Sequence, residues 1–237
     1  MATVEDAIAA VADVEGWLTP AQATRLWERA TELGPAGRVA EIGSYRGRSA
    51  IVLAMAAPSG AQVIAIDPHA GNDRGPQQIE GTAQEGEGDN AAFRANLERA
   101  GVAGRVRHVR LPSQEALAEV PGELDLLYVD GAHRYGPARD DLARWGARVR
   151  TGGHMLVHDS FSSIGVTLAI ARLLVLGGSF RYEGRTGSLA EYTRAPLSGS
   201  ARVRNALRQS AELPWFARNV VIKLLTVLRV RRGDWPY

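Results

Sequence analysis

Short apolar runs alternate with helical stretches through the middle of this chain, and this alternation limits the fold more than any other feature. The runs have the length of strands and are rich in Val, Ile or Leu. They cover Val39 to Ile42, Gln62 to Ile66, Val106 to Val109, Leu124 to Val129 and Met155 to Val157. The stretches with helical spacing cover Arg48 to Ala57, Ala91 to Ala100, Gln114 to Val120 and Ala138 to Val149. The pattern predicts an α/β fold, a doubly wound and mostly parallel sheet with helices on both faces.

The flanking segments add elements at both ends of this core. Two helices are expected first, from Val4 to Val14 and, after a Thr19-Pro20 start signal, from Ala21 to Leu33. A further helix follows Ser163 and runs to about Leu176. Two shorter runs, Ser179 to Tyr182 and Leu189 to Thr193, are expected to pair antiparallel at one edge of the sheet. We therefore divide the chain into an N-terminal helical cap (1–35), a central domain (36–196) and a C-terminal tail (197–237).

One stretch interrupts the alternation. Residues 69–90, "HAGNDRGPQQIEGTAQEGEGDN", are polar, rich in glycine and too long for a plain connection. They are predicted to form a lid or substrate loop, and a disordered insertion is the alternative.

Composition excludes several classes of protein. A chain of 237 residues is long enough for one large α/β domain. It contains no cysteine, so a disulfide framework, a thiolate metal site and a cysteine nucleophile are all excluded. The amino terminus has early acids and no basic segment before its apolar residues, which argues against a secretory signal and predicts a cytoplasmic protein.

The C-terminal tail is basic. Its eight basic residues stand against Glu212 and Asp234, which gives about +6 there and about −4 in the rest of a chain of net charge +2. The segment "WFARNVVIKLLTVLRVRR" is apolar but too interrupted by charge to span a bilayer. Two hypotheses compete for this segment. In the first, it forms an amphipathic helix that lies on an anionic membrane, at its inner face, or against a lipid-linked substrate. In the second, it forms a helix in a homodimer interface. A helix packed on its own domain is the third. Nucleic acid is not expected as a partner, because no RNA-binding motif is present.

A glycine turn follows the first predicted strand, with the spacing E-x-G-x-x-x-G over Glu41, Gly43 and Gly47. In an open parallel sheet this turn is where the backbone approaches a ligand most closely. The spacing differs from the fingerprint for a pyrophosphate, and Glu41 would repel phosphate but suits an ammonium or sulfonium group. Asp67 ends the second strand, where a carboxylate can accept both hydroxyls of a ribose. These features predict a nucleoside with an amino-acid arm, S-adenosylmethionine. The alternative is purely structural, with Glu41 as a capping acid and Asp67 as a turn residue before Pro68.

Two acid and histidine pairs end later strands. The run "LLYVDGAH" ends in Asp130, with His133 three residues on, and "HMLVHDS" ends in His158 and Asp159. Parallel strands would bring the two aspartates together, and a divalent cation would hold both of them ionised. Magnesium is the cation expected, since it prefers hard oxygen ligands.

In this order, "VAEIGSYRGRSA", "VIAIDP", "RLPSQEAL" and "LDLLYVDGAHRY" resemble the class I S-adenosylmethionine-dependent methyltransferases, over about Arg38 to Val157. The acid pairs resemble the metal-dependent small-molecule O-methyltransferases of the catechol and macrolide-sugar types. The resemblance implies a Rossmann-like methyltransferase fold and assigns roles to three groups of residues. Glu41, Gly43 and Gly47 would hold the methionine part, Asp67 the ribose, and Ser113 and Gln114 would lie beside the adenine. Ser49 is a further residue expected to bind the cofactor.

The same resemblance makes Asp130 and Asp159 the metal ligands and His133 the base. The resemblance leaves the third ligand open between His158 and Ser160. Enzymes of the catechol type have asparagine where this chain has Ser160. Enzymes of the sugar type have an acidic pair where this chain has His158-Asp159. Histidine is a poor ligand for magnesium. Without a metal, Asp130 would orient His133, or His158 would be the base and Asp159 a helix N-cap.

The chain has three further histidines. His69 is placed where it could contact substrate, and His108 and His154 are given no role.

The sequence thus predicts a methyltransferase that acts on a hydroxyl of a small molecule, a sugar or glycolipid ahead of a phenol. Two alternatives stay open, a metal-independent methyltransferase for another acceptor and a non-catalytic protein that binds S-adenosylmethionine.

Overall fold

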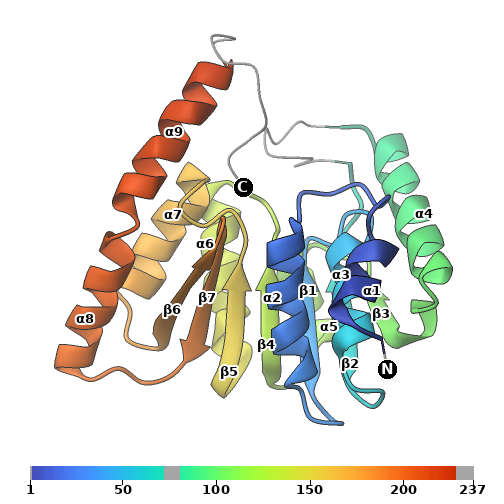
Figure 1. Cartoon of the computed structure of the whole chain (residues 1–237), viewed down its shortest axis with the longest axis horizontal. Helices are drawn as coiled ribbons and strands as arrows, with labels where there is room; N and C mark the ends of the chain where they lie inside the picture. Colours follow the sequence, from blue (N-terminus) through green and yellow to red (C-terminus); the bar gives the residue numbers. More distant parts are fainter. Residues whose placement is uncertain (1, 72–80, 228–237) are drawn as a thin grey trace.

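In the part of the chain that the structure describes, seven strands form one sheet at the centre of the protein (Figure 1). The computed structural model describes residues 2–71 and 81–227. The strands are β1 (Arg38–Ile42), β2 (Gln62–Ile66), β3 (Val106–Val109), β4 (Leu124–Val129), β5 (Val149–Val157), β6 (Phe180–Thr186) and β7 (Leu189–Arg194). Their spatial order is β3-β2-β1-β4-β5-β7-β6.

The pairing of the strands confirms the predicted topology. Strands β1 to β5 pair in parallel, with Val39 opposite both Val63 and Leu126, whereas β7 pairs antiparallel with β5 and with β6 at the edge. Strand β5 begins six residues before the predicted Met155, because its first half contains Gly152 and Gly153 and has no apolar run. The sheet order reverses between β1 and β4, and such a point opens a crevice at the carboxyl ends of the strands.

Helices cover both faces of the sheet, as predicted. They are α1 (Val4–Ala10), α2 (Pro20–Thr31), α3 (Arg48–Ala56), α4 (Ala83–Arg99), α5 (Ser113–Glu119), α6 (Tyr135–Arg144), α7 (Ile164–Ile170), α8 (Gly199–Ser210) and α9 (Leu213–Val227), with short turns of helix η1 (Ala103–Arg105), η2 (Gly146–Arg148) and η3 (Ala171–Val175). Successive strand residues enter different cores: Val39 packs with α1 to α4 on one face, and Ala40 packs with α5 to α7 on the other.

Helix α4 corrects the prediction for residues 69–90. It begins at Ala83 rather than Ala91, and its N-terminus has a capping box in which Thr82 and Glu85 each bind the other's backbone. Gly86 lies in its first turns because a Cβ there would overlap the backbone of residues 69–71. The glycine that suggested a loop is therefore a point of close packing. Residues 72–80 of the predicted lid lie outside the described residues.

The described part of the tail packs on its own domain. Asn205 of α8 is buried and bonds to the free edge of β6, accepting from the Tyr182 amide at 2.7 Å and donating to the Phe180 carbonyl at 3.1 Å. On α9, buried Asn219 donates to the Phe161 carbonyl at 3.0 Å. Within residues 2–71 and 81–227, no helix is long and apolar enough to cross a membrane.

Candidate functional site

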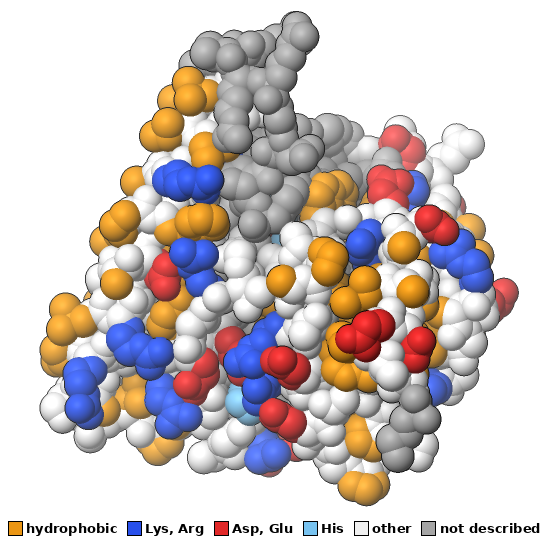
Figure 2. Space-filling model, viewed as in Figure 1, with side chains coloured by type: hydrophobic (Ala, Val, Ile, Leu, Met, Phe, Trp, Pro, Cys, Tyr) orange, Lys and Arg blue, Asp and Glu red, His pale blue; other side chains and the backbone are white. Residues whose placement is uncertain are grey.

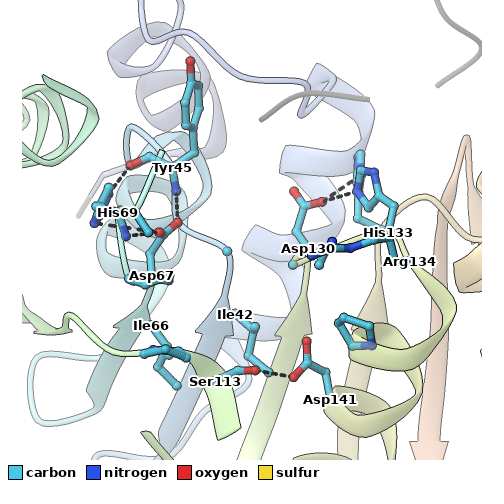
Figure 3. A pocket seen from close by; sticks show the side chains of 18 of the residues that line it. Ile42, Tyr45, Ile66, Asp67, His69, Ser113, Asp130, His133, Arg134 and Asp141 are labelled. Carbon is cyan, nitrogen blue, oxygen red and sulfur yellow. Dashed lines mark hydrogen bonds and ion pairs between the residues drawn. The ribbon is translucent and has the colours of Figure 1, made fainter. Parts of the chain in front are cut away.

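A cavity of about 380 Å³ opens at the carboxyl ends of β1, β2 and β4, where the sheet order reverses (Figure 3). Gly43, Asp67, Ser113 and Gln114 line it on the side predicted to bind the cofactor. The predicted acids and histidines line it on the other side, namely Asp130, His133, His158 and Asp159. The structure therefore brings these members of both predicted groups into one cavity, whereas Glu41, Gly47 and Ser49 are not among the residues that line it.

The two glycines of the first turn are required by packing within the protein. Gly43 has φ +86°, and a Cβ there would overlap the backbone carbonyl of Asp130. Gly47 has φ +89°, and a Cβ there would lie 3.1 Å from the ring of Phe93. The first glycine lets β1 and β4 approach at the cavity, and the second lets α4 pack beside α3. Gly43 lines the cavity, and Gly47 is not among the residues that line it.

Asp67 shapes the glycine turn from the end of β2. Its Oδ2 accepts from the Ser44 amide at 3.0 Å and the Tyr45 amide at 2.8 Å, and its Oδ1 accepts from the His69 amide at 2.8 Å. Tyr45 has φ +43°, an uncommon conformation for a residue other than glycine. The carboxylate predicted for the ribose thus also fixes the backbone around it.

Glu41 lies beneath the cavity rather than in its wall. Its side chain is fully buried and accepts from the Ser49 hydroxyl, while its Oε2 has no hydrogen-bond partner among the described residues. Burial raises the pKa of Glu41 to about 8, opposed by the hydroxyls of Ser49 and Ser44 and assisted by the charges of Asp130 and Asp67. The predicted anion is therefore mostly protonated at neutral pH, and Ser49 is its partner at the start of α3.

Two residues fix the position of Ser113, namely Asp141 of α6 and Trp145, which directly follows that helix. The Ser113 hydroxyl donates to Asp141, and its carbonyl accepts from the Trp145 indole at 3.1 Å. Burial raises the pKa of Asp141 to about 6, against the effect of the Ser113 hydroxyl. Asp141 also lines the cavity, so it adds a buried carboxyl group to the part predicted for adenine.

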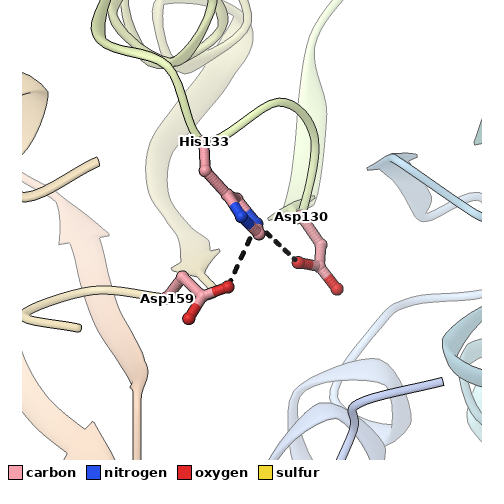
Figure 4. A group of neighbouring side chains, drawn as sticks. All are labelled: Asp130, His133 and Asp159. Carbon is pink, nitrogen blue, oxygen red and sulfur yellow. Dashed lines mark ion pairs between the residues drawn. The ribbon is translucent and has the colours of Figure 1, made fainter. Parts of the chain in front are cut away.

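The second group of residues forms a compact cluster of charge (Figure 4). His133 Nε2 lies 3.0 Å from Asp159 Oδ2 and 4.0 Å from Asp130 Oδ1. His158 Nδ1 lies 3.2 Å from Asp130 Oδ1 and 3.6 Å from Asp159 Oδ2. Both aspartates therefore have imidazole partners in the folded chain.

The pKa values in the cluster follow from these pairs. Burial acts to lower the pKa of His158, but Asp130 and Asp159 outweigh it and raise the pKa to about 10. Burial likewise opposes the ionised form of Asp159, but His133 and His158 hold its pKa well below the usual range. The pKa of His133 is raised because Asp159 and Asp130 outweigh its burial. His158 is thus charged at neutral pH and paired with both carboxylates.

The donor atoms also fit a metal ion. One atom each from Asp130, His133 and Asp159 lie within 4.8 Å of one another, and Asp159 Oδ1 is buried without a hydrogen-bond partner among the described residues. Of the two candidates for a third ligand, Ser160 is buried and donates to the Val157 carbonyl at 2.8 Å, whereas His158 faces both carboxylates.

The loop that carries Asp159 is strained and is held by the C-terminal helix. Asp159 and Phe161 have φ of +54° and +53°, and such strain persists only where the surroundings fix the backbone. The bond from Asn219 of α9 to the Phe161 carbonyl supplies one such restraint. Lys223, one turn further along α9, interacts electrostatically with Asp159, so α9 borders the site.

Several residues at the cavity were not predicted. Trp17 lines it from the segment before α2 and packs on Tyr45, with ring centroids 5.5 Å apart. Asp89 of α4 lines it and pairs with Arg46 at 2.9 Å. Arg134, next to His133, also lines it. None of them follows an apolar run at a strand end, the signal that identified the other site residues.

The remaining histidines occupy different surroundings. His69 is buried at the cavity wall, and its Nε2 lies 2.7 Å from the Tyr45 carbonyl. His108 packs between His69 and Phe93, at centroid distances of 5.0 and 4.6 Å. His154 Nδ1 lies 3.2 Å from Glu191 Oε1, away from the cavity.

Comparison with known proteins identifies the class. Residues 40–160, half of the chain, match a family described as "Methyltransferase domain". The chain belongs to this methyltransferase family, which confirms the enzyme class and the resemblance found in the sequence.

Solved structures show the same fold at low sequence identity. The cofactor-bound Rv0187 of MTB is 23% identical, with a TM-score of 0.57 over 81% of this chain and 88% of its own. An O-methyltransferase from Bacillus cereus in complex with SAH is 19% identical, with a TM-score of 0.56 over 81% of this chain and 90% of its own. The O-methyltransferase TomG from Streptomyces achromogenes, involved in tomaymycin synthesis and in complex with SAM, is 18% identical, with a TM-score of 0.52 over 83% of this chain and 89% of its own. The fold is therefore that of the class I methyltransferases.

Proposed function

We propose that this methyltransferase transfers a methyl group from S-adenosylmethionine to a hydroxyl of a small-molecule acceptor, with His133 as the general base. The observation that carries the proposal is the pair formed by His133 Nε2 and Asp159 Oδ2, 3.0 Å apart at the wall of the cavity. A buried carboxylate beside an imidazole fixes the ring and stabilises the charge that the imidazole gains with a proton.

The choice of methyl donor is supported by the other half of the cavity. Gly43 and Asp67 line it at the ends of β1 and β2, and Ser113 and Gln114 line it at the start of α5. These are the places predicted for the methionine, ribose and adenine parts. The structures from Bacillus cereus and Streptomyces achromogenes, which share the fold, contain SAH and SAM.

The proposed reaction is one displacement and one proton transfer. The acceptor oxygen attacks the methyl carbon, the bond from carbon to sulfur breaks, and sulfur keeps the electron pair to give S-adenosylhomocysteine. The hydroxyl proton moves to the His133 imidazole. Asp159 stabilises the resulting imidazolium, and the walls of the cavity hold the two reactants in line, which supplies much of the acceleration in such a reaction.

Magnesium is proposed as a further component, held by Asp130 and Asp159. The position of the two carboxylates supports it, since one oxygen of Asp130 and one of Asp159 lie within 4.8 Å of each other. When bound, magnesium orients the acceptor hydroxyl and makes it easier to deprotonate. With the ion held by the carboxylates, His133 stays available as the base.

For the acceptor we propose a polyhydroxylated molecule, a sugar or a glycolipid. The cavity wall carries several polar groups besides the cluster, among them Asp89, Arg134 and Asp141. Trp17 offers an apolar face at the same cavity, and sugars commonly pack a ring face on an aromatic side chain while their hydroxyls bond to polar groups.

The test is methyl transfer from S-adenosylmethionine to a panel of sugars, glycolipids and phenols, with magnesium or with a chelator. Asp159→Asn should lower kcat by about a hundredfold or more and leave S-adenosylhomocysteine binding within about twofold. Asp140→Asn is a matched control, because Asp140 lies on α6 and pairs with Arg139 outside the cavity. Full activity of Asp159→Asn on the best acceptor would refute the role of the pair.

One observation favours a metal-independent reaction as the second candidate. His158 Nδ1 lies within 3.6 Å of both aspartates and carries charge at neutral pH, so it already compensates them. In this case Asp130 and Asp159 would orient the histidines. A rate unchanged by chelator, but abolished in His133→Ala, would support this candidate and eliminate magnesium.

A further inference from the structure

Among the described residues, more than half of the exposed large hydrophobic side chains lie on α8 and α9. In the described residues, every exposed large hydrophobic side chain comes after residue 134, and five of the nine belong to the two C-terminal helices. Those five are Val203 and Leu207 of α8 and Leu213, Val221 and Leu224 of α9. Figure 2 shows hydrophobic side chains along the outer edge formed by α8 and α9, with Lys and Arg among them. A patch of this kind on one face usually marks a binding surface.

The spacing of these residues places them on the outer face of each helix. Leu213, Ala217, Val221 and Leu224 recur every three or four residues along α9, and the three large ones are 54–56% exposed. Val203 and Leu207 are four residues apart on α8, at 60% and 65% exposure. Together they form an apolar stripe along the two consecutive helices.

The inner faces of these helices are fixed, so the stripe cannot turn inward. Asn205, Gln209 and Asn219 are buried and bond to the backbone of the domain, to Phe180, Leu174 and Phe161. Burying such amides with their bonds satisfied is favourable, and rotating the helix would break the bonds.

The charge beside the stripe is positive. Arg202, Arg204, Arg208 and Arg218 are exposed on these two helices, whereas Lys223 of α9 interacts with Asp159 on the inner side. Glu212, the acid between them, is occupied by Arg185 at 2.6 Å and by the Tyr182 hydroxyl at 2.9 Å. A second copy of the chain would bring two sets of these arginines into one symmetric interface, with the same sign of charge on both sides. Nucleic acid would use the charges and leave the apolar side chains exposed.

We infer that the outer face of α8 and α9 binds the surface of an anionic lipid bilayer, with the stripe in the interface and the arginines at the headgroups. Apolar side chains on one helix face, flanked by basic residues that reach toward phosphates, are the features of helices that lie in this plane. Since the inner face of α9 borders Asp159, binding would bring the catalytic cavity close to the lipid surface.

The test is flotation of the full chain with vesicles of phosphatidylglycerol and phosphatidylcholine in equal parts, and with vesicles of phosphatidylcholine alone. Wild type should float with the anionic vesicles, less so at high salt, and stay behind with the neutral ones. Arg204→Gln with Arg208→Gln should weaken partition by about thirtyfold. Arg94→Gln with Arg99→Gln, at exposed positions of α4, removes the same charge elsewhere and should leave partition unchanged.

A second variant tests the stripe itself. Leu213→Ser, Val221→Ser and Leu224→Ser together should weaken partition by at least about tenfold, while circular dichroism and S-adenosylhomocysteine binding stay as in wild type. Failure of wild type to float with anionic vesicles overturns the inference. A second result would also overturn it: sedimentation shows that wild type is a dimer and the serine variant a monomer, while flotation is the same for both. A second copy of the chain would then cover this face.

Discussion

Relative to wild type, the Glu41→Gln protein should become increasingly stable as the pH rises, because only wild type loses stability when Glu41 ionises. The folded pKa of Glu41 is about 8 because the side chain is buried, and the reference value is 4.5. A raised pKa means that the stabilising contribution of the protonated acid is complete below about pH 4.5 and is lost as the pH rises to about 8. Each pH unit in this window costs wild type about 1.4 kcal/mol that glutamine does not lose. By pH 7 the accumulated difference in the free energy of unfolding is about 3 kcal/mol.

Urea denaturation of wild type and Glu41→Gln at pH 5, 6, 7 and 8 would measure this difference. Comparing the two proteins at each pH cancels the titration of groups that do not interact with Glu41. Glu123→Gln, at an exposed position before β4, controls for the loss of a carboxylate. A difference between wild type and Glu41→Gln that stays constant from pH 5 to pH 8 would refute the argument. The same substitution should weaken S-adenosylmethionine binding if the positive charge of the ligand's ammonium group is paired with ionised Glu41.

Three further substitutions test the site and its supports. Gly43→Ala should destabilise the fold by more than about 3 kcal/mol in denaturation, because its Cβ would overlap the Asp130 carbonyl at a φ of +86°; a loss below 1 kcal/mol would contradict this. Asn219→Ala should cost about 1–3 kcal/mol, since it leaves the buried Phe161 carbonyl without a donor, and kcat should fall more than cofactor affinity; an unchanged melting temperature would count against it. His133→Ala should lower kcat by about 10²- to 10⁴-fold while calorimetry finds cofactor binding unchanged, and a variant of wild-type rate would remove it as the base.

Periodicity predicted the strands well because the sheet is buried on both faces. Runs such as Leu124–Val129 must be apolar throughout, and such runs are visible in one sequence. Helix α4 was missed in part because Gly86 has a tertiary reason that local sequence does not carry, namely its contact with the backbone of residues 69–71. The predicted range of β5 was too short for a similar reason, since Gly152 and Gly153 give no strand signal.

The site was predictable as far as it lies at strand ends. Asp67, Asp130 and Asp159 follow apolar runs, and parallel topology brings such positions to one edge. Charge balance was not predictable, because the pairs of Asp130 and Asp159 with His158 depend on side-chain directions in the folded chain. Trp17 reaches the cavity from a helix connection distant in sequence, and no local pattern marks it.

Asn205 has a consequence for how the protein behaves in a crowded solution. Strand β6 ends the sheet, and the outer edge of such a strand offers amide and carbonyl groups to which another extended chain can bind. The Asn205 amide mimics a neighbouring peptide group and occupies both the Tyr182 N–H and the Phe180 carbonyl. A side chain from the tail thus blocks strand addition at this point, and a chain shortened before α8 should be prone to edge-to-edge aggregation.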